Sequence, residues 1–150
     1  MVLQQNIKDK IIDTINETIS KTNTEKIILY GGATSKTLSE RINQHTNEDK
    51  RFENMHFKLL HETNSYDVII EAEKFLIEKL SELNNNPRYE ILNAKAEDGK
   101  LIQTGGNGIR KDDEKYRLYL LINNKKYNFM ENVFVYNPFN LLRYFNWYNY

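Results

Sequence analysis

Four side chains of this sequence have the chemistry needed to hydrolyse a phosphodiester bond: Tyr30, Arg41, His45 and Glu73. Hydrolysis requires stabilisation of the negative charge on the attacking and departing oxygens, and the planar guanidinium of Arg41 can bind two phosphate oxygens at once. Glu73 is a candidate ligand for Mg²⁺ or Mn²⁺, because Mg²⁺ in proteins is usually held by one or two carboxylates, with water and substrate phosphate completing its shell. Tyr30, assisted by His45, is a candidate to accept or relay the proton of an attacking water.

The elements that must position these side chains are an alternation of helices and strands. Apolar residues recur at every fourth position over residues 3–19, which predicts an amphipathic helix. The β-branched run at 26–30 predicts a buried strand, and we expect it to end in a turn at Gly31 and Gly32. Tyr30 then lies at the end of a strand, beside whatever helix follows.

Two further helices are predicted to carry the other three candidates. Thr34 or Ser35 is expected to cap a helix that holds Arg41 and His45. A strand over about 55–61 follows, and then a helix that starts between residues 64 and 67 and ends at 84–87. Glu73 lies within the apolar stripe of this last helix.

The C-terminal third has a different pattern. Two strand-like runs, at 115–122 and 125–136, meet at two asparagines and predict a hairpin. Residues 138–150 are too rich in aromatic and leucine side chains for a solvated tail, so we expect them to dock on the body of the protein, a partner or a ligand. A homodimer formed through this aromatic segment is one such arrangement.

These patterns predict an α+β fold, with a small, mainly antiparallel sheet flanked by helices over residues 1–98. Residues 99–150 are expected to add the hairpin and the aromatic tail, packed on the same domain. The 150-residue chain has 21 basic and 21 acidic residues, so it has no global basic field, and any anion site must be local.

Other classes of protein are excluded by what the sequence lacks. Without cysteine it can form neither disulfides nor thiolate zinc sites, and it has no cysteine nucleophile. No run approaches the roughly 20 apolar residues of a membrane-spanning helix, and the first residues do not form a secretory signal. We therefore expect an intracellular protein without a membrane partner.

The candidate residues also form an ordered pattern. A Tyr-x-Gly-x-Thr motif is followed by a Leu, by an Arg nine residues after the Gly, and by a His one turn later; these residues are Tyr30, Gly32, Thr34, Leu38, Arg41 and His45. Glu73 then begins a Glu-x-x-Leu-Ile pattern, and residues 87–89 read Pro-Arg-Tyr.

This ordered set, over residues 26–93, resembles the GIY-YIG nuclease superfamily. The resemblance implies a DNA endonuclease that depends on a divalent metal, Mg²⁺ or Mn²⁺. It also implies that Arg41 binds the scissile phosphate and that Glu73 binds the metal. Tyr30 and His45 would be the groups that handle protons.

The sequence departs from the family pattern in its first motif. The Gly-Ile-Tyr tripeptide, whose Tyr belongs to the active site, is missing before residue 26, where a helix is expected. Glu90 stands where an Asn usually follows Pro-x-Tyr, and Gly31 replaces an aliphatic residue. One arrangement would restore the missing strand: residues 115–120 would occupy its place beside 26–30 and bring Tyr116 or Tyr119 to the cleft, as a permuted sheet.

Three of the four candidate residues also have a purely structural interpretation. Tyr30 can be a core residue with its hydroxyl at the rim, Arg41 can pair with Glu40, and Glu73 can mark the edge of an apolar stripe. The corresponding functional alternatives are a catalytically degenerate GIY-YIG-like module that binds nucleic acid or a protein partner, and a structural or host-interaction protein of a virus or mobile element. The hydrolase hypothesis requires the side chains of Arg41 and Glu73 to converge on one groove.

Overall fold

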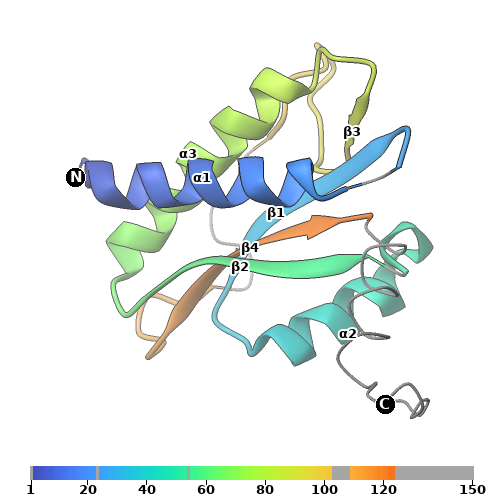
Figure 1. The fold of residues 1–150 in the computed structure, drawn as a ribbon. Helices are drawn as coiled ribbons and strands as arrows, with labels where there is room; N and C mark the ends of the chain where they lie inside the picture. The colour runs from blue at the N-terminus through green and yellow to red at the C-terminus, as the bar shows by residue number, and fades with distance from the viewer. Residues whose placement is uncertain (1, 23, 54, 103–108, 124–150) are drawn as a thin grey trace, which may run out of the picture.

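A mixed sheet of four strands forms the centre of the fold (Figure 1). The computed structural model describes residues 2–22, 24–53, 55–102 and 109–123. Its elements, in chain order, are α1 (Gln5–Ser20), β1 (Ile27–Thr34), α2 (Leu38–Glu48), the short 3₁₀ helix η1 (Lys50–Phe52), β2 (His56–Thr63), α3 (Tyr66–Leu83), β3 (Tyr89–Ile91) and β4 (Tyr116–Ile122). The α+β class and the predicted order of helix, strand, helix, strand and helix up to α3 are confirmed.

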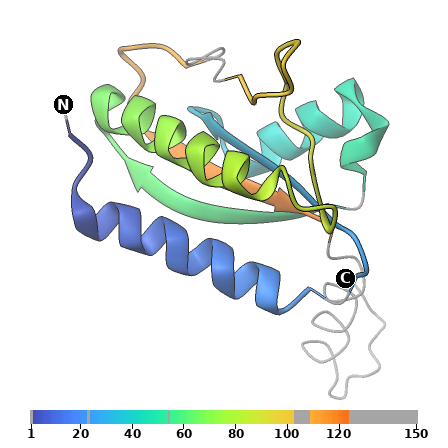
Figure 2. The same cartoon turned by 90° about the horizontal axis from the view of Figure 1, so that it is seen from above.

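The strands are ordered β2-β4-β1-β3. β4 is antiparallel to both of its neighbours, and β3 is parallel to β1. Helices α1 and α3 bury their apolar residues in one core cluster, on one face of the sheet. Phe52 of η1 and partly buried Leu38 of α2 pack on the other face, so that α1 and α2 lie on opposite sides of the sheet (Figure 2).

The two long helices follow the predicted apolar stripes. In α1 the stripe buries Ile11 and Ile15, and in α3 it buries Ile69 and Leu80, among others. Ser65 caps α3, since its hydroxyl accepts a hydrogen bond from the backbone N–H of Val68. Within the described ranges, no helix is both long enough and apolar enough to cross a membrane.

β1 does not end at its two glycines, which corrects the predicted turn. It continues through Gly31 and Gly32 to Thr34. A Cβ atom on Gly31 would lie 2.7 Å from side-chain atoms of both Leu76 and Leu80, and one on Gly32 would lie 2.7 Å from the hydroxyl of Tyr119. The glycines are therefore required for the close approach of neighbouring side chains to the strand.

The longer strand also moves the start of the next helix. Thr34 belongs to β1, so neither it nor Ser35 caps α2. Thr37 does so instead: its side chain accepts a hydrogen bond from the backbone of Glu40, and the Glu40 carboxylate accepts one from the backbone of Thr37. This reciprocal capping box fixes the first turn of the helix that carries Arg41 and His45.

β4 is an internal strand, which changes the predicted C-terminal arrangement. The strand predicted at 115–122 is confirmed, and it lies beside β1 as the permuted arrangement requires. Both edges of β4 pair, one with β1 and the other with β2. β4 is thus part of the same sheet as β1 and β3, and residue 98 marks no boundary in it. The second run, 125–136, and the aromatic segment 138–150 lie outside the described residues.

Candidate functional site

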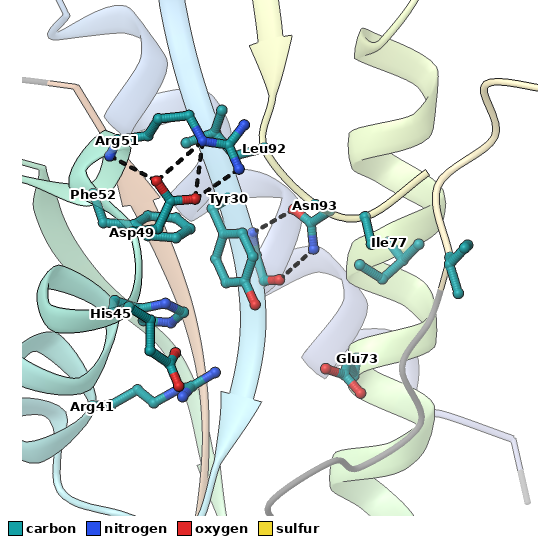
Figure 3. Close-up of a pocket in the computed structure, with 14 residues that line it drawn as sticks. Tyr30, Arg41, His45, Asp49, Arg51, Phe52, Glu73, Ile77, Leu92 and Asn93 are labelled. Atoms are coloured by element: carbon teal, nitrogen blue, oxygen red, sulfur yellow. Dashed lines mark hydrogen bonds and ion pairs between the residues drawn. The ribbon is translucent and has the colours of Figure 1, made fainter. Parts of the chain in front are cut away.

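The short strand β3 leaves part of the edge of β1 accessible. β3 pairs only with residues 27–29, whereas β1 continues to Thr34. Directly beyond β3, the side chain of Asn93 extends the pairing: its Nδ2 donates to the carbonyl oxygen of Gly31 at 2.7 Å, and its Oδ1 accepts from the N–H of Gly31 at 3.0 Å. At this edge, α2 and α3 face each other across β1 (Figure 3).

A pocket of about 390 Å³ lies at this edge. All four predicted site residues line it: Tyr30, Arg41, His45 and Glu73. Arg41 and Glu73 extend from helices on opposite faces of the sheet, and the hydroxyl of Tyr30 points into the space between them (Figure 3). The convergence that the hydrolase hypothesis requires is therefore present.

Glu73 lies well inside the apolar stripe of α3. Its side chain is only 6% exposed and shares the buried face with Ile69 and Leu76. Among the described residues, no group of three or more His, Cys, Asp or Glu side chains could hold a metal ion. Glu73 could supply one carboxylate to a divalent ion, whose other ligands would then be mainly water and substrate oxygens, as is usual for Mg²⁺.

The hydroxyl of Tyr119 connects the two functional side chains of α2. It accepts a hydrogen bond from Nε of Arg41 at 3.0 Å and lies 2.8 Å from Nε2 of His45. Tyr119 lies opposite Gly32 in the sheet, and its ring is fully buried. Tyr116, the other phenol considered for this place, donates instead to the carbonyl oxygen of Arg110. Tyr119 is thus the second phenol beside the pocket, and its hydroxyl anchors the guanidinium of Arg41 there.

The charge states of this cluster follow from its burial. Burial and the positive charge of Arg41 lower the pKa of His45 to about 4, so its imidazole is neutral at neutral pH. Burial raises the pKa of Tyr119, and burial also raises the pKa of Tyr30, with a further contribution from the charge of Glu73 against an opposing one from Arg41. Both phenols therefore keep their protons at neutral pH. The neutral Nε2 of His45 can then accept the Tyr119 proton, while Arg41 donates to the same oxygen.

Comparison with known proteins identified no similar protein. No protein-family model, curated protein or solved structure matches this chain. The resemblance to GIY-YIG nucleases accordingly depends on the residues named above and on their convergence in one pocket.

Several pocket residues were not singled out from the sequence, among them Asn93, Asp49 and Arg51. Asn93 follows the apolar pair Ile91-Leu92, and a lone amide at the end of a strand is a signal that could have marked it. Asp49 and Arg51 lie just beyond α2, where a polar stretch is typical of an ordinary helix end. Only the packing of η1 beside β1 brings them to the pocket.

The neutral imidazole predicts a pH dependence of stability. Because the pKa of His45 falls from 6.5 to about 4 on folding, its contribution is complete above pH 6.5 and is lost as the pH falls towards 4. We expect the free energy of unfolding to decrease by up to about 3 kcal/mol over this range, apart from the effect of carboxylates. Urea unfolding at several pH values measures it. The variant His45→Gln should lack this component, and an identical pH profile in both proteins would contradict the prediction.

Proposed function

We propose that this protein is a divalent-metal-dependent DNA endonuclease of the GIY-YIG type, which hydrolyses phosphodiester bonds. One observation carries the proposal: a guanidinium and a buried carboxylate, from helices on opposite faces of the sheet, line one pocket together with a phenol and an imidazole. A cation that binds phosphate and an oxygen ligand for a hard metal are the two groups that such a reaction needs first.

The metal fits the residues that are present. Glu73 offers a hard oxygen ligand at the wall of the pocket, and the carboxylate of Glu48 lines the same pocket. When bound, a divalent ion would act as a Lewis acid toward the phosphate and lower the pKa of a bound water.

Arg41 is proposed to bind the scissile phosphate. Tyr119 accepts a hydrogen bond from Nε of the guanidinium, which holds the guanidinium at the wall of the pocket, where a planar guanidinium can bind phosphate oxygens. Arg41 is half-buried, and a charge-assisted bond there is stronger than one in open water. Because two fixed groups, the helix backbone and the Tyr119 hydroxyl, orient the guanidinium, little reorganisation is needed when the phosphate binds.

The proton of the attacking water is proposed to leave through the aromatic cluster. The hydroxyl of Tyr30 faces the pocket and takes this proton as it passes its own proton on towards Tyr119. Tyr119 in turn donates to the neutral imidazole of His45, 2.8 Å away. One water O–H bond is broken and one imidazole N–H bond is formed, so no phenolate is required at rest. This matters because the pKa of both phenols is raised.

Those same raised pKa values favour the second candidate, a GIY-YIG-like module that has lost catalysis and only binds nucleic acid. A phenol with a raised pKa is deprotonated in a smaller fraction of molecules at neutral pH, so less phenolate is present to accept a proton, and the sequence lacks the Gly-Ile-Tyr tripeptide. The two candidates differ in whether a phosphodiester bond is cut at all. Both predict binding that weakens as salt is added.

The test is incubation of the purified protein with supercoiled plasmid in Mg²⁺, in Mn²⁺ or in EDTA. We expect nicked or linear DNA with either metal and none in EDTA. Arg41→Ala should slow cutting by about 10²-fold to 10³-fold, since it removes the charge that faces the phosphate. Arg88→Ala removes an exposed arginine outside the pocket and is the matched control.

Three outcomes separate the candidates. Cutting that survives Arg41→Ala, with the fold intact by circular dichroism, would remove this residue from the mechanism. Absence of cutting with every metal, alongside salt-dependent binding, would support the binding module. Absence of both cutting and binding would exclude a nucleic-acid function for this pocket.

A further inference from the structure

The pocket has a second guanidinium, that of Arg51, which the proposed hydrolysis does not use. Arg51 and Arg41 both line the pocket, and in Figure 3 they lie towards its two ends, with the ring of Tyr30 between them in that view. Residues 41 and 49 are separated by about 12 Å along the axis of α2. The wall formed by α2 and η1 therefore has a cation near each end.

Asp49 holds Arg51 in place. Its two carboxylate oxygens accept hydrogen bonds from Nε of Arg51 at 3.0 and 3.2 Å, and Oδ2 also accepts from Nη2 at 2.7 Å. The backbone N–H of Arg51 donates to the same carboxylate. Across the described part of the chain, no hydrogen bond uses Nη1 of Arg51. Asp49 thus fixes one side of the guanidinium fork and leaves the other side available.

The ion pair between Arg51 and Asp49 is also weak enough for Arg51 to bind a second anion. The side chain of Arg51 is 60% exposed, so its ion pair with Asp49 is screened by water and contributes little to stability. An approaching anion therefore has to compete with a solvated contact, and a planar guanidinium can serve two acceptors at the same time.

We infer that Arg51 forms a second phosphate subsite, which binds a phosphate flanking the scissile one. This inference rests on the proposed function, because it assigns the scissile phosphate to Arg41. It defines the substrate class: a polynucleotide strand with several phosphates along one backbone, and not an isolated phosphodiester. A substrate with one phosphate can occupy the Arg41 end only, whereas a strand can reach both ends of the wall.

The test compares two substrates and two variants of the full chain. The substrates are a short DNA oligonucleotide and thymidine 5′-(p-nitrophenyl) phosphate, which has a single phosphodiester. Arg51→Ala should raise KM for the oligonucleotide about tenfold and leave kcat/KM for the small diester unchanged. Lys50→Ala removes an equal charge from the next residue, which does not line the pocket, and should change neither.

The affinity of the protein for the oligonucleotide can be measured without catalysis. With Ca²⁺ in place of Mg²⁺, oligonucleotide binding measured by fluorescence anisotropy should weaken in Arg51→Ala, and the slope of log affinity against log salt should fall by about 1. The subsite would be overturned if Arg51→Ala reduced activity equally on both substrates or on neither. It would also be overturned if Lys50→Ala caused the same loss, or if the wild-type protein did not bind the oligonucleotide. Wild-type protein that binds the oligonucleotide but cuts neither substrate would refute the proposed function alone, since the binding comparison would still decide the role of Arg51.

Discussion

Replacement of Glu73 by Gln is expected to abolish nearly all metal-dependent cutting while leaving the fold intact. The change keeps the shape of the side chain and removes the negative charge that would hold the metal, so we expect a loss of at least about 10²-fold in cleavage rate. An amide is less costly to bury than a carboxylate, and Glu73 is only 6% exposed, so the free energy of unfolding should not fall by more than about 1 kcal/mol.

Two measurements make this prediction specific to the site. Glu78→Gln, an exposed change on the same helix, should cut plasmid at the wild-type rate. Glu73→Gln should also lower the pKa of Tyr30 in an ultraviolet titration at alkaline pH, because the Glu73 charge contributes to raising that pKa. Retained activity in Glu73→Gln would remove the metal ligand from the proposal. An unchanged titration would mean that the carboxylate does not face Tyr30.

Replacement of Leu118 by Ala is expected to have the largest effect on stability. Leu118 is fully buried in the internal strand β4 and belongs to the core cluster beneath α1 and α3. Deletion of such a side chain typically costs about 2–5 kcal/mol, since it loses burial and leaves a cavity. Urea unfolding followed by circular dichroism measures the difference.

Leu59→Ala is the matched control, because it makes the same chemical change on the neighbouring strand β2, where the side chain is 40% exposed. We expect a loss below about 1 kcal/mol there. Similar losses at both positions would mean that β4 is no more central than β2, and would contradict the strand order on which the position of Tyr119 depends.

The features that were predictable from the sequence are those that depend on the spacing of apolar residues within one segment. The four-residue spacing of isoleucines predicted α1, the broad apolar stripe predicted α3, and the apolar and β-branched runs predicted β1, β2 and β4, whereas the three-residue strand β3 was not predicted. The spacing of Arg41 and His45, one helical turn apart, placed both on one face of α2, where they do contact the same hydroxyl.

The features that were missed depend on contacts between distant parts of the chain. Gly31 and Gly32 were interpreted as a turn because glycine usually marks one, but their role is to admit Leu76 and Tyr119, which lie far along the sequence. The choice between Tyr116 and Tyr119 could not be made before the register of β4 against β1 was known. A shift of one residue reverses which side chains face α2, and no local pattern fixes that shift.

The position of β4 also has a consequence for synthesis on the ribosome. β4 follows β1 and β2 in the chain yet lies between them, so neither strand can acquire this neighbour until residues 116–122 have emerged. Until then the nascent chain has two unsatisfied strand edges and is vulnerable to aggregation. Arg41 and His45 also lack their shared hydroxyl during this time. The pocket can therefore be completed only late in translation. A chain on a ribosome that stalls before codon 116 would lack the completed pocket.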